Sequence, residues 1–112
     1  MQEKIAVPSS ATLRKYGLTE QDFWEILHLQ GGICPIIGKL PNPSKRDGKI
    51  HFVIDHFHAK GFAKMPPEKR KTYVRGLVSW YSNRYFLSKG IDEEKALNIA
   101  AYLKRFEQRR KP

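Results

Sequence analysis

The stretch that decides the fold reads Val53-Ile54-Asp55-His56-Phe57-His58-Ala59-Lys60-Gly61. Residues 50–54, which lead into it, are rich in β-branched and aromatic side chains, and this composition predicts a strand. The strand ends in Asp55 and His56, where the backbone constrains both side chains as it turns away from the core. A carboxylate is a hard oxygen ligand suited to Mg²⁺, and an imidazole titrates near neutral pH. The pattern therefore predicts a metal ligand beside a proton acceptor.

Other motifs accompany this stretch in a definite order. They are Gly31-Gly32-x-Cys34-x-x-x-Gly38 before it, then Arg75-Gly76-Leu77 and Asn83 after it. The ordered set resembles the recombination endonuclease VII family of phage nucleases, a branch of the HNH or His-Me finger endonucleases. The resemblance extends from Tyr16-Gly17-Leu18-Thr19 to Ala100-Ala101-Tyr102-Leu103. No single motif is very specific, but their order is.

The resemblance implies an α+β fold: a small ββα-metal core, made of a β-hairpin plus a helix, flanked by N- and C-terminal helices. It implies a metal-dependent DNA endonuclease that uses Mg²⁺, with Mn²⁺ able to substitute. Asp55 and Asn83 would hold the metal, His56 would be the catalytic base, and His58 would assist catalysis by contacting the phosphate. The expected substrate is duplex or branched DNA, such as a Holliday junction, and the expected assembly is a homodimer.

The chain departs from the family pattern at the zinc ligands. The family usually carries two Cys-x-x-Cys pairs that hold a structural zinc, and here the corresponding positions are Cys34, Ile37, Ser79 and Ser82. A serine hydroxyl is a poor zinc ligand and isoleucine is none, so one thiolate is insufficient. We expect no structural zinc and apolar packing in its place. A second departure is Phe57, where the family often has an acidic residue.

Each candidate residue also has an ordinary structural interpretation. An Asp after a strand commonly caps a turn, and an isolated histidine most often binds backbone carbonyls. An Asn within a helix usually faces solvent. We favour the functional interpretation for Asp55, His56 and Asn83, because three unrelated coincidences at family positions would otherwise be needed, and favour it only modestly for His58. Arg75 has two interpretations: it clamps a phosphate, or it braces its loop through hydrogen bonds to backbone carbonyls.

The composition predicts the partner. The formal net charge is +10 over 112 residues, which favours a polyanion as partner. Nucleic acid is favoured over an anionic membrane, because no segment shows the broad apolar face that interfacial helices need. A solvated basic surface, a non-catalytic DNA-binding module that keeps the ββα shape, and an RNA-associated protein are the alternatives. The expected DNA contacts are Lys60, Lys69, Arg70, Lys71, Arg75 and Arg84.

Length and cysteine content set the organisation. We expect an N-terminal arm at 1–17 that opposes regular structure and a single nuclease domain at 18–112. A single cysteine excludes an intramolecular disulfide and favours a reducing, cytoplasmic setting. No stretch is apolar over the length of a bilayer span, so no membrane association is expected.

Local patterns predict three helices and a β-hairpin within the domain. Thr19 and Asp22 form a capping box for a helix over 19–30, which Gly31-Gly32 ends. Residues 33–37 and 50–55 are expected to pair as an antiparallel hairpin. A helix over 79–88 carries four aromatic residues that we expect to pack on the core and the hairpin, and Lys89-Gly90 ends it. A last helix runs from Asp92, as N-cap, to Gln108 with an apolar stripe.

Overall fold

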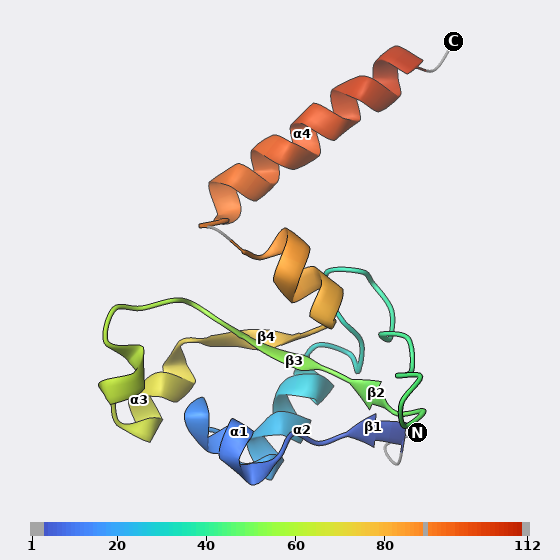
Figure 1. Ribbon diagram of the computed structural model, residues 1–112. Helices are drawn as coiled ribbons and strands as arrows, with labels where there is room; N and C mark the ends of the chain where they lie inside the picture. The colour runs from blue at the N-terminus through green and yellow to red at the C-terminus, as the bar shows by residue number, and fades with distance from the viewer. Residues whose placement is uncertain (1–3, 89, 111–112) are drawn as a thin grey trace.

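The computed structural model describes residues 4–88 and 90–110. It is a mixed α+β structure in which short strands are interleaved with helices (Figure 1). The α-helices are α1 (Ser10–Lys15), α2 (Glu20–Leu29), α3 (Pro67–Thr72) and α4 (Glu93–Arg110). The strands are β1 (Ile5–Ala6), β2 (Ile50–His51), β3 (Val53–His56) and β4 (Val74–Val78). A 3₁₀ turn, η2, covers Phe62–Lys64, and a π-helical segment, η3, covers Ser82–Phe86.

The central sheet pairs β3 with β4, and this corrects the predicted hairpin. The two strands run antiparallel, with Val53 opposite Val78 and Ile54 opposite Leu77. Residues 33–37 form no strand; Cys34 and Lys39 make an isolated bridge that closes a tight turn, as Pro35 and Gly38 favour. The second predicted strand, over 50–55, is divided at Phe52 into β2, which pairs with β1, and β3, which pairs with β4. Residues 74–78 take the place of 33–37 because they supply the aliphatic run that a buried strand needs.

The N-terminal segment is regular, contrary to the expected arm. Ile5 and Ala6 pair in parallel with Ile50 and His51 of β2. Ser9 then begins α1, since its hydroxyl accepts a hydrogen bond from the backbone amide of Thr12 at 3.2 Å. Pro8 and the serines therefore mark a helix start instead of opposing structure. The first three residues of the expected arm lie outside the described residues.

Helix α2 begins as predicted. The Thr19 hydroxyl accepts from the Asp22 amide at 3.1 Å, and the Asp22 carboxylate accepts from the Thr19 amide at 2.9 Å. This reciprocal pair confirms the capping box. The helix buries Phe23 and Leu27 against the sheet.

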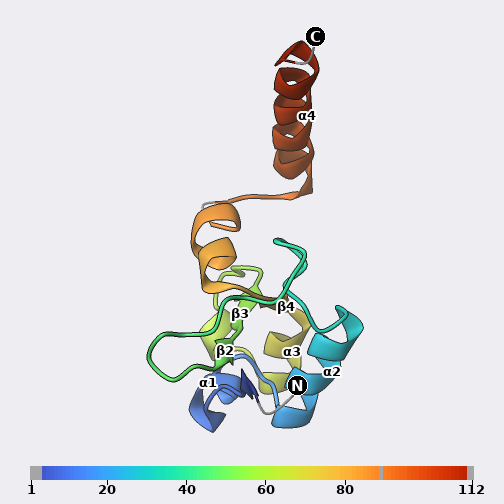
Figure 2. The same ribbon diagram turned by 90° about the vertical axis from the view of Figure 1, so that its right-hand side faces the viewer.

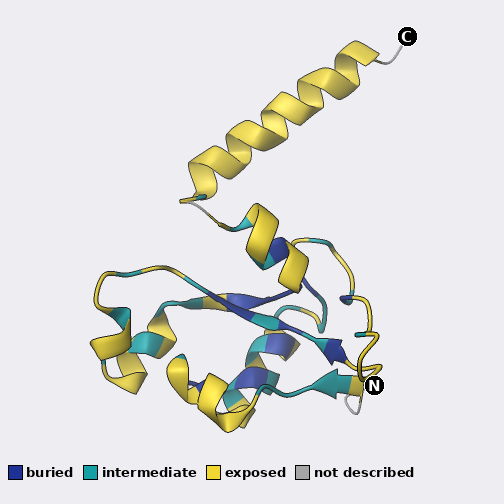
Figure 3. Ribbon diagram, viewed as in Figure 1, coloured by how far each residue is buried: buried dark blue, intermediate teal, exposed yellow. Residues whose placement is uncertain are grey.

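The core lies between the β3–β4 sheet and the helices α1 and α2, where the buried segments gather (Figure 3). Its buried apolar side chains are Leu13, Leu18, Phe23, Leu27, Cys34, Ile50, Phe52, Ile54, Leu77 and Val78. The Gln30 amide joins helix to strand: its Nε2 donates to the Leu77 carbonyl at 2.6 Å, and its Oε1 accepts from the Leu77 amide at 3.0 Å. Gln30 thus pairs with β4 as a neighbouring strand residue would.

Glycine is required at the turn between α1 and α2. Gly17 has a φ of +72°, a conformation that residues with a Cβ rarely adopt. A Cβ there would also collide with the backbone carbonyl of Pro67, at the start of α3. This close approach brings α3 against the turn and places the 57–73 connection beside α1.

The η3 segment and helix α4 extend from the side of the sheet opposite to α1 and α2 (Figures 1 and 2). The helix predicted over 79–88 exists from Trp80 to Phe86 and changes to π hydrogen bonding at Ser82. Its four aromatic residues are at least half exposed, not packed on the core as expected, because Ser82 takes the buried side of the segment, against Cys34. Lys89, part of the predicted helix end, lies outside the described residues.

Helix α4 was predicted correctly as an element. It begins after Asp92, whose carboxylate accepts from the Lys95 amide at 2.8 Å, and it projects from the rest of the molecule (Figure 2). None of its described residues is buried, including those of its apolar stripe (Figure 3). In the part of the chain that the structure describes, this and every other helix is too short or too polar to cross a bilayer.

Candidate active site

The predicted catalytic stretch lies at the end of β3, where the sheet contains a β-bulge. Asp55 is opposite Gly76, but the next residue, His56, is opposite Val74. Arg75 is therefore an extra residue on β4 with no counterpart on β3. Bulges of this kind redirect a side chain and are common next to active sites. Here the bulge places Arg75 beside Asp55.

Asp55 and Arg75 form a bidentate ion pair. The Arg75 Nε donates to Asp55 Oδ2 at 2.8 Å, and Nη2 donates to Oδ1 at 2.9 Å. Asp55 is only 5% exposed, whereas the Arg75 side chain is 38% exposed. The hydrogen bond to Asp55 also raises the pKa of the Arg75 guanidinium. The structure thus shows Arg75 bound to a carboxylate, a contact that the sequence did not predict.

His56 lies among aromatic rings. Its ring centroid is 5.0 Å from that of Tyr16 and 4.8 Å from that of Phe62, and it stacks on His58 at 4.6 Å. Burial lowers the pKa of His56, and its electrostatic interaction with His58 lowers it further, while Asp55 opposes this shift. The imidazole is therefore neutral at neutral pH, which is the form that accepts a proton.

A pocket of about 500 Å³ opens beside the sheet, and its polar lining includes His58, Arg75, Asn83 and Arg84. We call it the His58 pocket. An adjoining pocket of about 310 Å³, the Asp55 pocket, is lined by Asp55 and again by Arg75. The fold therefore brings His58 and Asn83 together from separate segments, and Arg75 connects them to Asp55. His56 does not line either pocket.

Asn83 is held on the π-helical segment by a serine pair. The Ser82 side chain is fully buried, and its hydroxyl accepts from that of Ser79 at 2.8 Å. The Ser79 hydroxyl in turn accepts from the Ser82 amide at 3.1 Å. These hydrogen bonds fix the start of the π-helical segment, directly before Asn83. Turns of this kind are frequently found at functional sites.

The four positions expected from the family's zinc ligands lie together. Cys34 Sγ is 3.8 Å from Ser82 Oγ and accepts from the Ser79 amide at 3.3 Å. Burial raises the pKa of the Cys34 thiol, but hydrogen bonds from the amides of Ile37, Ser79 and Ile36 and from Ser82 outweigh it, so the net pKa is lowered. The packing at this point is a polar hydrogen-bonded cluster, not the apolar packing that we expected.

The donor set suits a magnesium ion better than a zinc ion. Within residues 4–88 and 90–110, no three or more His, Cys, Asp or Glu side chains are grouped so that they could hold a metal. Mg²⁺ does not need such a group, since it commonly takes one or two protein carboxylates and fills its other positions with water and phosphate oxygens. Asp55 and Asn83 are oxygen donors of the right kind. A metal at Asp55 would have to share the carboxylate oxygens with Arg75 or displace its guanidinium.

The six cationic side chains predicted to contact DNA have different surroundings. Lys60, Lys69 and Arg84 are exposed, and the Arg84 guanidinium lies over the rings of Trp80 and Tyr85. The Lys71 ammonium instead pairs with Asp22 of the α2 cap at 2.8 Å.

Arg70 has the strongest internal contacts of this group. It is half-buried and donates to the backbone carbonyls of Met65 and Arg14. Arg70 and Lys71 therefore connect α3 to the N-terminal helices, so we expect their replacement to disturb the fold.

Sequence reasoning missed the surroundings of His56. Tyr16 and Phe62 were not identified as site residues, although Tyr16 begins a motif that we noted. Only the packing of α3 and η2 on α1 reveals their position.

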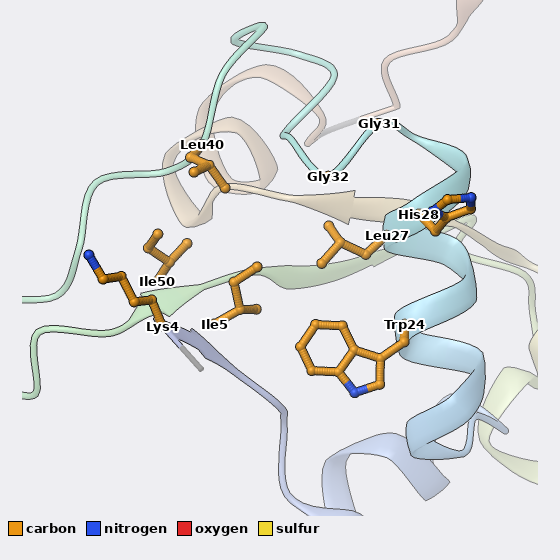
Figure 4. A pocket seen from close by; sticks show the side chains of 9 residues that line it. All are labelled: Lys4, Ile5, Trp24, Leu27, His28, Gly31, Gly32, Leu40 and Ile50. Atoms are coloured by element: carbon orange, nitrogen blue, oxygen red, sulfur yellow. The ribbon is translucent and has the colours of Figure 1, made fainter. Parts of the chain in front are cut away.

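Another pocket, of about 470 Å³, lies on a different part of the molecule between α2, β1 and the turn at Leu40 (Figure 4). Its lining is mainly apolar, with Trp24, Leu27 and Ile50 facing it, and it contains none of the candidate catalytic residues.

Comparisons with known proteins agree with the motif order. A family model described as recombination endonuclease VII matches residues 9–105. The Gene 59 proteins of Mycobacterium phage D29 and Mycobacterium phage L5 are each 32% identical to the chain over 75 residues. These alignments cover 67% of this chain but 36% of each relative, so the chain spans about a third of the length of these relatives. No solved structure matches.

Proposed function

Because the chain belongs to the recombination endonuclease VII family, we propose that it is a Mg²⁺-dependent endonuclease that hydrolyses phosphodiester bonds in DNA. One observation supports this most directly: His58, Asn83, Arg75 and Arg84 line one pocket, and two of them contact the other candidates, since Arg75 pairs with the buried Asp55 and His58 stacks on His56. Carboxylate, imidazole and cation are the groups that metal-assisted phosphodiester hydrolysis needs.

Each residue has a distinct role in this proposal. Asp55 and Asn83 would hold the metal through oxygen atoms, and the bound metal would stabilise negative charge on the leaving 3′ oxygen. His56 would accept the proton of the attacking water as the new P–O bond forms. The products would carry 5′-phosphate and 3′-hydroxyl ends. His58, which stacks on His56 and lines the pocket, would orient the scissile phosphate.

The charge around the His58 pocket supports DNA as the substrate. Arg75 and Arg84 line the pocket, and the whole chain has a net charge of +10. We identify no base-reading motif in the sequence, so recognition would depend on the DNA backbone and its shape. Branched DNA such as a Holliday junction is the preferred substrate in this proposal, and nicking of ordinary duplex is the alternative.

A non-catalytic DNA-binding module is the second candidate function. The observation that favours it is the Asp55–Arg75 pair, which occupies both oxygens of the proposed metal ligand. If Arg75 never releases Asp55, the protein would bind DNA without cutting it.

A cleavage assay separates the two functions. The protein is incubated with supercoiled plasmid and with a synthetic four-way junction, in Mg²⁺ or in EDTA, and the products are resolved on a gel. The nuclease requires cleavage in Mg²⁺ and none in EDTA. His56→Ala should bind DNA normally and cleave it about 10² to 10⁴ times more slowly, the usual contribution of a general base. Binding without cleavage by the wild type would favour the module, and undiminished cleavage by His56→Ala would place the chemistry on other residues.

A further inference from the structure

Asp55 has a buried carboxylate whose one ion-pair partner among the described residues is Arg75. Its residue is 5% exposed, and both carboxylate oxygens accept from Arg75, at 2.8 and 2.9 Å. A buried carboxylate is costly unless it is paired and hydrogen-bonded. Arg75 therefore supplies the positive charge beside Asp55, and a divalent cation would have to compete with it for the same two oxygens.

Arg75 is placed so that it can leave Asp55 while the sheet stays paired. It is the extra residue of the bulge between β3 and β4, so no residue of β3 lies opposite it. Its side chain is 38% exposed, and it lines both the Asp55 pocket and the His58 pocket. A guanidinium group that moved from one pocket to the other would meet His58, Asn83 and Arg84.

We propose that Arg75 is a resident counter-ion that competes with the divalent cation for Asp55 and is transferred to a DNA phosphate when the substrate binds. The inference rests on the proposed metal-binding role of Asp55. A guanidinium fork binds phosphate and carboxylate with the same bidentate geometry, so a phosphate in the His58 pocket offers Arg75 an equivalent partner. Arg75 is thus a positioning residue that controls when Asp55 is free.

This arrangement makes metal binding and DNA binding favour each other. In the absence of DNA, the metal must displace Arg75, so its apparent affinity is reduced by the fraction of protein in which Asp55 is free. A phosphate that binds Arg75 raises that fraction. By linkage, the metal raises DNA affinity by the same factor. The metal would then be held tightly mainly when substrate is present.

The test measures metal binding by the full chain without DNA. Mn²⁺ is titrated into the wild type, Arg75→Gln, Arg84→Gln and Asp55→Asn, and free Mn²⁺ is followed by electron paramagnetic resonance. Arg75→Gln should bind Mn²⁺ more tightly by a factor on the order of ten or more. Arg84→Gln is the matched control, since it removes an equal charge from the same pocket, and its affinity should change by less than about twofold. Asp55→Asn should abolish the site.

Thermal unfolding supplies a second readout. In EDTA, Arg75→Gln leaves Asp55 without its counter-charge, so its melting temperature should fall. Saturating Mn²⁺ should raise the melting temperature of Arg75→Gln by more than it raises that of the wild type. Arg75→Lys serves if the glutamine variant does not fold: lysine keeps the charge but lacks the fork, so its Mn²⁺ affinity should still exceed that of the wild type.

Two results would overturn the inference. The first is that the Arg75 variant that folds binds Mn²⁺ with the same affinity as the wild type. The second is that Arg84→Gln increases the Mn²⁺ affinity as much as Arg75→Gln does. Failure of the proposed function is recognised separately. If Arg75→Gln binds Mn²⁺ more tightly but the wild type cuts no DNA, the counter-ion role stands and the nuclease does not. If the wild type cuts DNA while Arg75→Gln keeps the wild-type Mn²⁺ affinity, the nuclease function stands and the counter-ion role does not.

Discussion

At the scale of single residues, the histidine pair sets the pH dependence of the proposed reaction. His56 must be neutral to accept a proton, and burial together with the electrostatic interaction with His58 lowers its pKa. The wild type should therefore keep its activity to a pH below the ordinary histidine pKa and lose it only in more acidic solution.

His58→Ala tests this coupling, because it removes one cause of the lowered pKa. The pKa of His56 should rise, so the acidic limb of the cleavage rate should move to higher pH. The measurement is the single-turnover cleavage rate between pH 5 and 8, roughly the range in which histidines titrate. Phe57→Ala alters an exposed neighbour and is the control. An unshifted limb in His58→Ala would show that His58 does not tune His56.

At the scale of elements, the cluster at the start of the π-helical segment occupies the family's zinc positions. Cys34, Ser79 and Ser82 form a buried hydrogen-bonded group. We predict that the purified protein holds well under one zinc per chain and stays folded in a chelator, because one thiolate cannot retain the ion. Elemental analysis and circular dichroism in EDTA check this, and stoichiometric zinc with unfolding in EDTA would contradict it.

The same geometry predicts a gain of zinc binding. Replacing Ile37, Ser79 and Ser82 together by cysteine would place four thiols around one point, because the backbone amides of Ile37 and Ser79 already face Cys34 Sγ. The triple variant should bind about one zinc per chain and melt at a higher temperature with zinc than in EDTA. A variant with only Ile37→Cys is the control and should bind none tightly.

Helix α3 separates two kinds of basic residue. Arg70 donates to carbonyls of two other segments, whereas Lys69 is exposed. Arg70→Ala should lower the free energy of unfolding by about 1–3 kcal/mol, since the carbonyls of Met65 and Arg14 both lose their donor. Lys69→Ala should change it by less than about 0.5 kcal/mol. Chemical denaturation measures both, and equal effects would show that Arg70 does not brace α3.

At the scale of the whole molecule, the net charge of +10 governs DNA binding. The logarithm of the association constant should fall with the logarithm of salt concentration by roughly 0.9 for each phosphate neutralised. Lys69→Ala, which keeps the fold, should reduce this slope by about one unit if Lys69 contacts a phosphate. The slope is measured by fluorescence anisotropy over a salt series. A slope unchanged by Lys69→Ala would show that the DNA does not contact Lys69.

The formation of a homodimer stays a prediction.

The sequence by itself determined the family, the elements with strong local signals and the identity of the candidate catalytic residues. The capping box at Thr19 and the helix after Asp92 follow from interactions between residues three or four apart. Asp55, His56 and Asn83 were chosen from sequence because they stand in family order.

Only the tertiary structure decided which strands pair and what surrounds those residues. β3 pairs with β4, which begins at Val74, 18 residues after β3 ends, and not with residues 33–37 as predicted. Strand pairing depends on which segments fill the core together. The bulge at Arg75, the aromatic rings around His56 and the Gln30–Leu77 bridge likewise join segments that are distant in sequence. No local pattern encodes such contacts, since they exist only once the chain has packed.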